Sequence, residues 1–245
     1  MISTPMLRRA LKQVATLGVN RAPPVREALA GRYLRGTGLE IGALNAPMWV
    51  PMGVTVRYVD RLPTEQLREQ YPELRDIALP NVDVVCDGEM LTPVRSHSVN
   101  FVVANHVLEH CQNPLRTIQE WLRVVNDDGI VFMAIPDKRL CFDAERPATP
   151  LAHVVDEFEH GAEKNERGHV EEWVTHVEKV PEAERAARVD ALLATKYSIH
   201  YHAWSWSEIV ELLAYARDRL GLSFEVEALQ RNGLEVVAVL RKRVR

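Results

Sequence analysis

The sequence predicts an α/β protein built on a mostly parallel sheet of seven strands, with an antiparallel hairpin at the C-terminal end. Two observations lead to this prediction: five strand-like segments alternate with helical ones, and two further strands flank Asn232-Gly233 near the end of the chain. Strands that alternate with helices favour parallel pairing, whereas an Asn-Gly pair between strands favours a hairpin. The segment 137–203 has a helical, acidic character, and we expect a helical insertion, or lid, after strand five.

Each element has a local signal. Pro23-Pro24 separates two N-terminal helices, Asn113-Pro114 supplies a cap residue and a proline at the first helical position, and Ser205 with Glu208 forms a capping box. Asn126 to Gly129 is expected to end the helix that begins at Asn113-Pro114. The predicted strands, rich in apolar and β-branched residues, lie near 39–41 and at 54–59, 82–86, 99–104, 130–135, 222–229 and 234–240.

The composition fits a single domain over 1–245, with N-terminal helices in 1–35. Of the 245 residues, 47% are hydrophobic and 26% are charged, and the formal net charge is -4. This balance argues against a general nucleic-acid binder, and no apolar run is long enough to cross a bilayer. Three scattered cysteines without a C-x-x-C pair favour a cytoplasmic location. A homodimer is left open.

Acidic and glycine residues follow the predicted strands where an open α/β sheet binds ligands. Glu40 and Gly42 end the first strand, Asp60 ends the second, Asp87 follows the third and Asn105 follows the fourth. Ligands of such sheets bind in the crevice beyond the carboxyl ends of the strands. The sequence therefore predicts a site for a nucleotide-like cofactor, in which Asp60 can accept protons from ribose hydroxyls.

These segments resemble the motifs of the class I S-adenosylmethionine-dependent methyltransferases, over roughly 34–135. Leu39-Glu40-Ile41-Gly42 looks like the first motif of that family and Cys86-Asp87-Gly88-Glu89 like its third, while Val102 to His110 is similar to the small-molecule branch called type 11. The resemblance implies a Rossmann-like fold, S-adenosyl-L-methionine as cofactor and a small-molecule acceptor. The residues that it implies for cofactor binding are Glu40, Gly42, Ala43, Asn45, Asp60, Arg61, Asp87, Gly88, Glu89 and Asn105.

The first motif departs from the family pattern. Leu44 and Ala46 stand where the family usually has glycine, so we expect the loop to follow a somewhat different path. The G-x-G-x-x-G fingerprint is absent, which makes a nicotinamide oxidoreductase the least favoured alternative.

Four histidines are candidates for the chemistry. A hydroxyl nucleophile must lose a proton, and His106 or His110, expected one helical turn apart on the same face, could accept it. His200 and His202, on one side of an extended segment, are candidates for substrate contact. We therefore predict an O-methyltransferase acting on a sugar or natural-product hydroxyl in biosynthesis. No Asn/Asp-Pro-Pro-aromatic motif follows strand four, which argues against DNA as acceptor.

Two other functions stay open. The glycine-poor first motif is compatible with a non-catalytic binding protein on the same scaffold. A metal-dependent enzyme is the other alternative, because His153, Glu157 and His160 would share one helical face at i, i+4 and i+7. No zinc signature is present, so the sequence prediction assigns no metal ligand.

Overall fold

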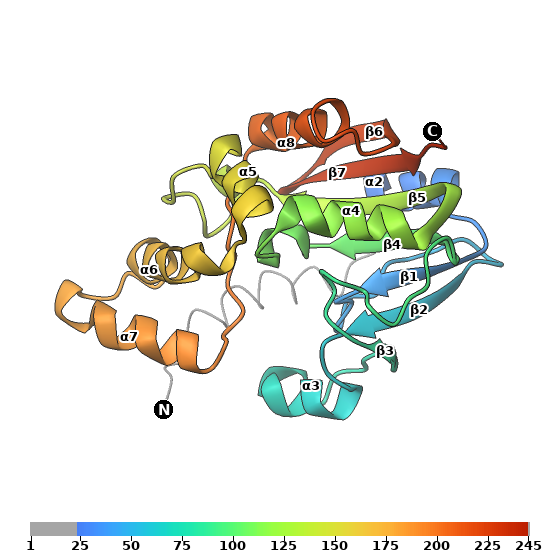
Figure 1. The fold of residues 1–245 in the computed structure, drawn as a ribbon. Helices are drawn as coiled ribbons and strands as arrows, with labels where there is room; N and C mark the ends of the chain where they lie inside the picture. The colour runs from blue at the N-terminus through green and yellow to red at the C-terminus, as the bar shows by residue number, and fades with distance from the viewer. Residues whose placement is uncertain (1–23, 245) are drawn as a thin grey trace.

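We analysed a computed structural model of the chain, which describes residues 24–244 (Figure 1). The first predicted N-terminal helix lies outside these residues. The second corresponds to α2 (Pro24–Tyr33). Among the described residues, none of the helices combines the length and the apolar character needed to cross a membrane.

Seven strands form one sheet in the order β3-β2-β1-β4-β5-β7-β6. The first five strands pair in parallel, and β7 pairs antiparallel with both β5 and β6. This arrangement confirms the predicted mostly parallel sheet with its C-terminal hairpin. The strands are β1 (Thr37–Ile41), β2 (Thr55–Asp60), β3 (Val82–Val85), β4 (Val99–Asn105), β5 (Val125–Pro136), β6 (Phe224–Asn232) and β7 (Glu235–Lys242).

Helices cover both faces of the sheet. On β4, Val102 and Ala104 belong to a core that also contains residues of α4 (Pro114–Val124) and α8 (Trp206–Asp218). Phe101 and Val103 belong to a second core that includes residues of α2. Alternate residues of a strand point to opposite faces, so a strand covered on both sides is apolar throughout. This explains the nearly continuous apolar run of β4.

The predicted helix starts are confirmed by their caps. The Asn113 side chain accepts the Arg116 N–H at 3.2 Å at the start of α4, and the Ser205 N–H donates to Glu208 Oε2 at 2.8 Å at the start of α8. Each bond satisfies a backbone N–H at the start of a helix that has no partner within the helix. A short helix, α3 (Thr64–Gln70), connects β2 to β3.

Two strands extend into segments that were predicted to lie between elements. Residues 126–129, expected to end the helix before strand five, lie within β5, because α4 already ends at Val124; Asp128 has a positive φ of 59°, and the pairing with β4 shifts register. In the hairpin, β6 extends to Asn232, so only Gly233 and Leu234 separate it from β7. Gly233 alone supplies the positive φ there, at 59°.

The segment after β5 forms the predicted helical insertion. It contains α5 (Leu151–His160), α6 (Glu166–His176) and α7 (Glu182–Ala194). Helices α6 and α7 pack through a small core of their own that includes Val174, Val189 and Leu192. Figure 1 shows this insertion beyond the ends of the parallel strands, with α6 and α7 away from the sheet. The insertion is therefore placed at the edge where ligands of such sheets bind.

Candidate active site

The carboxyl ends of β1 to β4 meet at one edge of the sheet. The register pairs Ile41 with Val59 on β2 and with Ala104 on β4, and it pairs Asp60 with Val85 on β3. Because β1 lies between β2 and β4, the strand order reverses at this point, as it does in nucleotide-binding sheets. The structure thus brings to one edge the strand ends that carry Gly42, Asp60, Asp87 and Asn105.

Glu40 is buried on β1 and closes the loop that follows. Its Oε1 and Oε2 accept the Met48 backbone N–H at 2.8 and 3.1 Å. Burial raises the pKa of Glu40 to about 7, although the Met48 N–H and the charge of Arg26 act in the opposite direction. A buried carboxylate needs such donors. In this structure, Glu40 therefore fixes the backbone of the 42–48 loop.

The loop itself departs from the expectation at one position. Leu44 has a φ of 44°, in the left-handed region that glycine favours. The chain therefore keeps a glycine-type conformation at Leu44 despite the cost of a Cβ atom. Gly42 has a φ of 63°, and the Ala46 N–H donates to the Ala43 carbonyl at 2.9 Å, which closes the turn around Asn45.

Asp60 lies at the end of β2, beside a small pocket. Its Oδ1 accepts the Arg61 N–H at 2.7 Å, and burial raises its pKa against the effect of that N–H. The Arg61 side chain reaches the Tyr71 hydroxyl at 3.4 Å. The Asp60 carboxylate at this strand end can accept protons from the hydroxyls of a ligand. The pocket is lined by Ala43, Leu44, Tyr58, Val59, Asp60, Leu67, Leu79, Pro80 and Val82.

Three close contacts position the turn after β3, residues 87–89. Asp87 Oδ1 accepts the Glu89 N–H at 2.8 Å. The Gly88 carbonyl accepts Trp121 Nε1 at 2.8 Å, and a Cβ on Gly88 would lie 2.6 Å from Ile41 Cγ2.

The Glu89 carboxylate accepts backbone N–H groups from the start of the next helix. Its donors are Gln112, at 2.9 Å, and Asn113, at 3.2 Å. Burial raises the pKa of Glu89, and these two N–H groups lower it. Glu89 therefore connects the turn after β3 to the start of α4.

Asn105, at the end of β4, has an unused acceptor. Its Nδ2 lies 3.3 Å from Met48 Sδ, and its Oδ1 is buried with no hydrogen-bond partner among the described residues. A buried carbonyl oxygen without a donor costs free energy. Asn105 Oδ1 therefore lacks one hydrogen-bond donor, which an N–H or ammonium group of a ligand could supply.

His106 and His110 do not share a helical face, which corrects the sequence prediction. His106 precedes a three-residue 3-10 helix, η2 (Leu108–His110), and has a φ of 56°. Its Nε2 lies 2.7 Å from Glu235 Oε2 on β7. His110 Nδ1 instead lies 2.8 Å from the Ile199 carbonyl. The two rings therefore point to different parts of the molecule.

His110 is held neutral. Burial and the neighbouring His200 lower its pKa to about 3, against the raising effect of the Ile199 carbonyl. In the neutral ring, Nδ1–H donates to that carbonyl and Nε2 keeps a lone pair. His110 can therefore accept a hydrogen bond from a ligand.

Glu109 is a functional candidate that sequence reasoning missed. It is 1% exposed, and neither carboxylate oxygen has a hydrogen-bond partner among residues 24–244. Burial raises its pKa, while His200 and His106 lower it. His200 Nε2 lies 3.9 Å from Glu109 Oε1, and the His110 and His200 rings are 4.5 Å apart. The only sequence signal was its place beside His110.

His200 is oriented by a second missed residue, Asp143. Its Nδ1 lies 2.6 Å from Asp143 Oδ2, and Arg146 Nη1 donates to Asp143 Oδ1 at 2.8 Å. Burial alone would raise the pKa of Asp143, but His200 and Arg146 lower it to about 2. Asp143 therefore stays ionised and fixes the tautomer of His200 that leaves Nε2 free.

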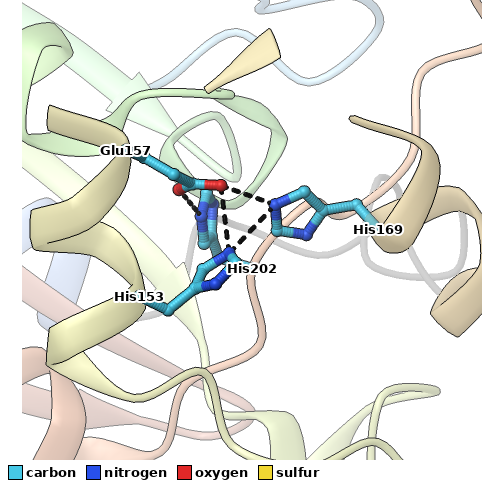
Figure 2. A group of neighbouring side chains, drawn as sticks. All are labelled: His153, Glu157, His169 and His202. Carbon is cyan, nitrogen blue, oxygen red and sulfur yellow. Dashed lines mark hydrogen bonds and ion pairs between the residues drawn. The ribbon is translucent and has the colours of Figure 1, made fainter. Parts of the chain in front are cut away.

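His202 belongs to a different group from His200. It is fully buried, and its Nε2 lies 2.8 Å from Glu157 Oε2 (Figure 2). His153 and His169 also contact Glu157. The predicted row of His153, Glu157 and His160 is wrong at its third member, because His160 is exposed and contacts Asp156 at 3.0 Å instead.

Comparison with known proteins identifies the class. Residues 36–133 match the family model described as "Methyltransferase domain", of type 11. No curated protein matches the chain in sequence.

Two solved structures resemble the whole chain. One is a SAM-dependent methyltransferase from Thermotoga maritima, described as a possible histamine N-methyltransferase; it has 18% identity and a TM-score of 0.51, with 97% of this chain and 99% of that chain covered. The other is a SAM-dependent methyltransferase from Aquifex aeolicus, with 15% identity, a TM-score of 0.51 and coverage of 99% and 100%. At these identities the likeness shows the fold alone.

The matched family and the sheet define a class I methyltransferase. More particularly, the chain is an S-adenosylmethionine-dependent methyltransferase whose residues 36–133 match the type 11 domain, and S-adenosyl-L-methionine is its methyl donor. The residues present fit this cofactor: the Asp60 carboxylate at the end of β2 can accept hydroxyl protons, and the Asn105 Oδ1 at the end of β4 lacks a donor.

Proposed function

We propose that this methyltransferase transfers the methyl group to a hydroxyl of a small molecule, such as a sugar or a natural product, in biosynthesis. The observation that supports this most is the buried Glu109 carboxyl without a partner, beside His110 and His200 at the carboxyl end of β4. A hydroxyl must lose its proton as the methyl group arrives, and the imidazole of His200 can accept it. The net charge of -4 supports an acceptor other than DNA.

In this proposal, the chain holds the cofactor along the sheet edge. Asp60 accepts the ribose hydroxyl protons, and the Asp87-Gly88-Glu89 turn borders the adenine. Gly42, Ala43 and Asn45 line the methionine end, where the unpartnered Asn105 Oδ1 accepts the ammonium group. Glu40 acts through the loop that it fixes, and Arg61 borders the ribose side. The bound cofactor supplies an electrophilic methyl group, and the protein aligns the acceptor with it.

The proton acceptor in this proposal is His200, a role that the sequence prediction gave to His106 or His110. Asp143 orients His200 as a carboxylate orients the histidine of a catalytic triad. His110, with a pKa of about 3, is too weak a base at neutral pH and instead accepts a hydrogen bond that positions the hydroxyl. His106, whose Nε2 contacts Glu235, keeps a supporting role near Glu109. His202 belongs to the group around Glu157 in Figure 2, and in this proposal it affects the acceptor only indirectly, through that group.

Aromatic side chains beside His200 support a small organic acceptor. The Phe142 and Trp173 rings lie 4.6 and 5.9 Å from the His200 ring. Trp173 Nε1 is buried and has no hydrogen-bond partner in the described part of the chain. An acceptor with an apolar ring and a polar edge would satisfy both features. A cytoplasmic location, which the free cysteines favour, belongs to this proposal.

The test is a methyl-transfer assay with labelled S-adenosylmethionine and two matched acceptor panels, one of sugars and phenols and one of amines. We expect transfer to hydroxyls, with the His200→Ala variant reduced by about 10²- to 10⁴-fold in kcat, as for loss of a general base. The His176→Ala variant, altered at the last residue of α6, is the control and should keep full activity. Transfer to amines alone, or an unaffected His200→Ala variant, would contradict the proposal.

A further inference from the structure

The group that surrounds Glu157 has the composition of a metal site. We propose that His153, Glu157, His169 and His202 bind one divalent transition-metal ion, zinc by preference, and that this ion has a structural role in the insertion. The four residues come from α5, from α6 and from the segment that returns to α8 (Figure 2). One ligand atom from each lies within 4.8 Å of all the others.

The distances among three of the four ligand atoms are close to those of a tetrahedral site, and His202 Nε2 lies 2.8 Å from the second oxygen of Glu157. His169 Nε2 and His153 Nε2 lie 2.7 and 3.0 Å from Glu157 Oε1, and the two nitrogens are 3.2 Å apart. Ligands about 2.0 to 2.1 Å from a tetrahedral zinc ion are roughly 3.3 Å from one another. An outward shift of a few tenths of an ångström at each side chain would therefore admit the ion.

Hydrogen bonding alone satisfies this group poorly. If His153 and His169 each donate an Nε2–H to Glu157 Oε1, two N–H donors face each other across 3.2 Å. A metal ion removes this conflict, because each neutral imidazole then presents a lone pair to the centre. The ion also balances the carboxylate charge of Glu157, which is completely buried.

Surrounding residues fix the ligands in place. Asn165 Nδ2 donates to Glu157 Oε1 at 3.1 Å, as a supporting donor to a metal-bound carboxylate does. The His202 ring stacks on Trp204 at 5.1 Å with an interplanar angle of 1°, and its Nδ1 has no hydrogen-bond partner among the described residues. Stacking on Trp204 and the contact of Nε2 with Glu157 Oε2 at 2.8 Å together set the orientation of His202.

The ligand set favours zinc in a structural site. Three imidazole nitrogens and one carboxylate oxygen suit zinc, and four protein ligands leave a tetrahedral ion without an open position. Only His153, whose side chain is 33% exposed, reaches the surface, which gives the ion a way in. His202 is two residues from His200, so the ion would also hold the segment that carries His200.

Metal content of protein purified without a histidine tag tests this proposal. We expect about one zinc per chain by mass spectrometry after dialysis against zinc, and a melting temperature that chelator lowers by on the order of 10 °C. Cobalt substitution should give the intense visible absorption of a tetrahedral ion. The His153→Ala variant, altered at the most exposed ligand, should lose the metal and the chelator effect, whereas His160→Ala, on the same helix, should retain both.

Several results would overturn the proposal. One is wild-type protein that binds no zinc and shows no change in melting temperature with chelator. Another is zinc content in His153→Ala and His169→Ala equal to that of the wild type. A third is a cobalt spectrum of octahedral type. Binding of S-adenosylhomocysteine is measured on the same samples. Because that binding depends on the sheet edge, its outcome reports on the proposed function separately from the metal.

Discussion

Both carboxylate oxygens of Glu40 accept the backbone N–H of Met48, at 2.8 and 3.1 Å, and so connect the end of β1 to the far side of the loop that follows it. This carboxyl is 2% exposed and has a pKa raised to about 7 by burial. The first motif of the methyltransferase thus contributes its acidic residue to loop closure. A ligand at the carboxyl edge would contact a loop that is already formed.

The raised pKa of Glu40 predicts a specific pH dependence of stability. Between about pH 4.5 and pH 7 the folded chain binds more protons at Glu40 than the unfolded chain does, so the contribution of Glu40 to the free energy of unfolding falls as pH rises. The raised pKa corresponds to roughly 3 kcal/mol. Urea denaturation gives the free energy of unfolding of wild type and of Glu40→Gln. As pH rises across this window, the difference between the two should shift in favour of the variant. A difference that is independent of pH would contradict the assignment.

The positive φ of Leu44 predicts an inverted effect of glycine and alanine. At most positions where φ is negative, a protein with glycine is less stable than the same protein with alanine. At Leu44, with φ of 44°, the Leu44→Gly variant should be more stable than Leu44→Ala by about 1 kcal/mol, because alanine keeps the Cβ atom that penalises this conformation. Both variants remove the rest of the side chain, so they are matched. Chemical denaturation of the pair measures the difference, and greater stability of Leu44→Ala would show that the loop has another conformation.

Close packing at Gly88 predicts a destabilising substitution. A Cβ atom there would lie 2.6 Å from Ile41 Cγ2, so Gly88→Ala should lower the free energy of unfolding by roughly 1 to 3 kcal/mol. Gly168, on α6, has nothing within 4 Å of the corresponding position, so Gly168→Ala should be neutral or stabilising by up to about 1 kcal/mol. Thermal unfolding of the two variants against wild type gives the comparison. Equal effects would mean that β1 and the turn after β3 are not in contact.

The sequence was most informative where a signal is local. The apolar strands, the Asn113 and Ser205 caps and the Asn232-Gly233 hairpin depend on residues close together in the chain, and the structure has each of them. The residues that follow the predicted strands also predicted where the cofactor binds, because parallel strands place their carboxyl ends at the same edge of the sheet.

The side-chain partners could not be predicted in the same way. Helical spacing suggested His160 as the neighbour of Glu157, but the side chain of His160 turns to Asp156, and His169 arrives from another helix. His106 and His110 separate because the backbone at His106 is left-handed rather than helical. Such contacts depend on how distant segments pack, and sequence spacing carries no information on that packing.

We propose that the carboxyl edge of the sheet binds the cofactor and that Asp60 is one of its ligands. The most direct measurement is isothermal titration calorimetry of S-adenosylhomocysteine with wild type, Asp60→Asn and the control Asp76→Asn, whose side chain is exposed after α3. Loss of hydrogen bonds to a charged acceptor predicts binding weaker by about 10- to 100-fold in Asp60→Asn, with Asp76→Asn equal to wild type. Wild-type protein that binds no cofactor, or an Asp60→Asn variant that binds as tightly as wild type, would contradict the account.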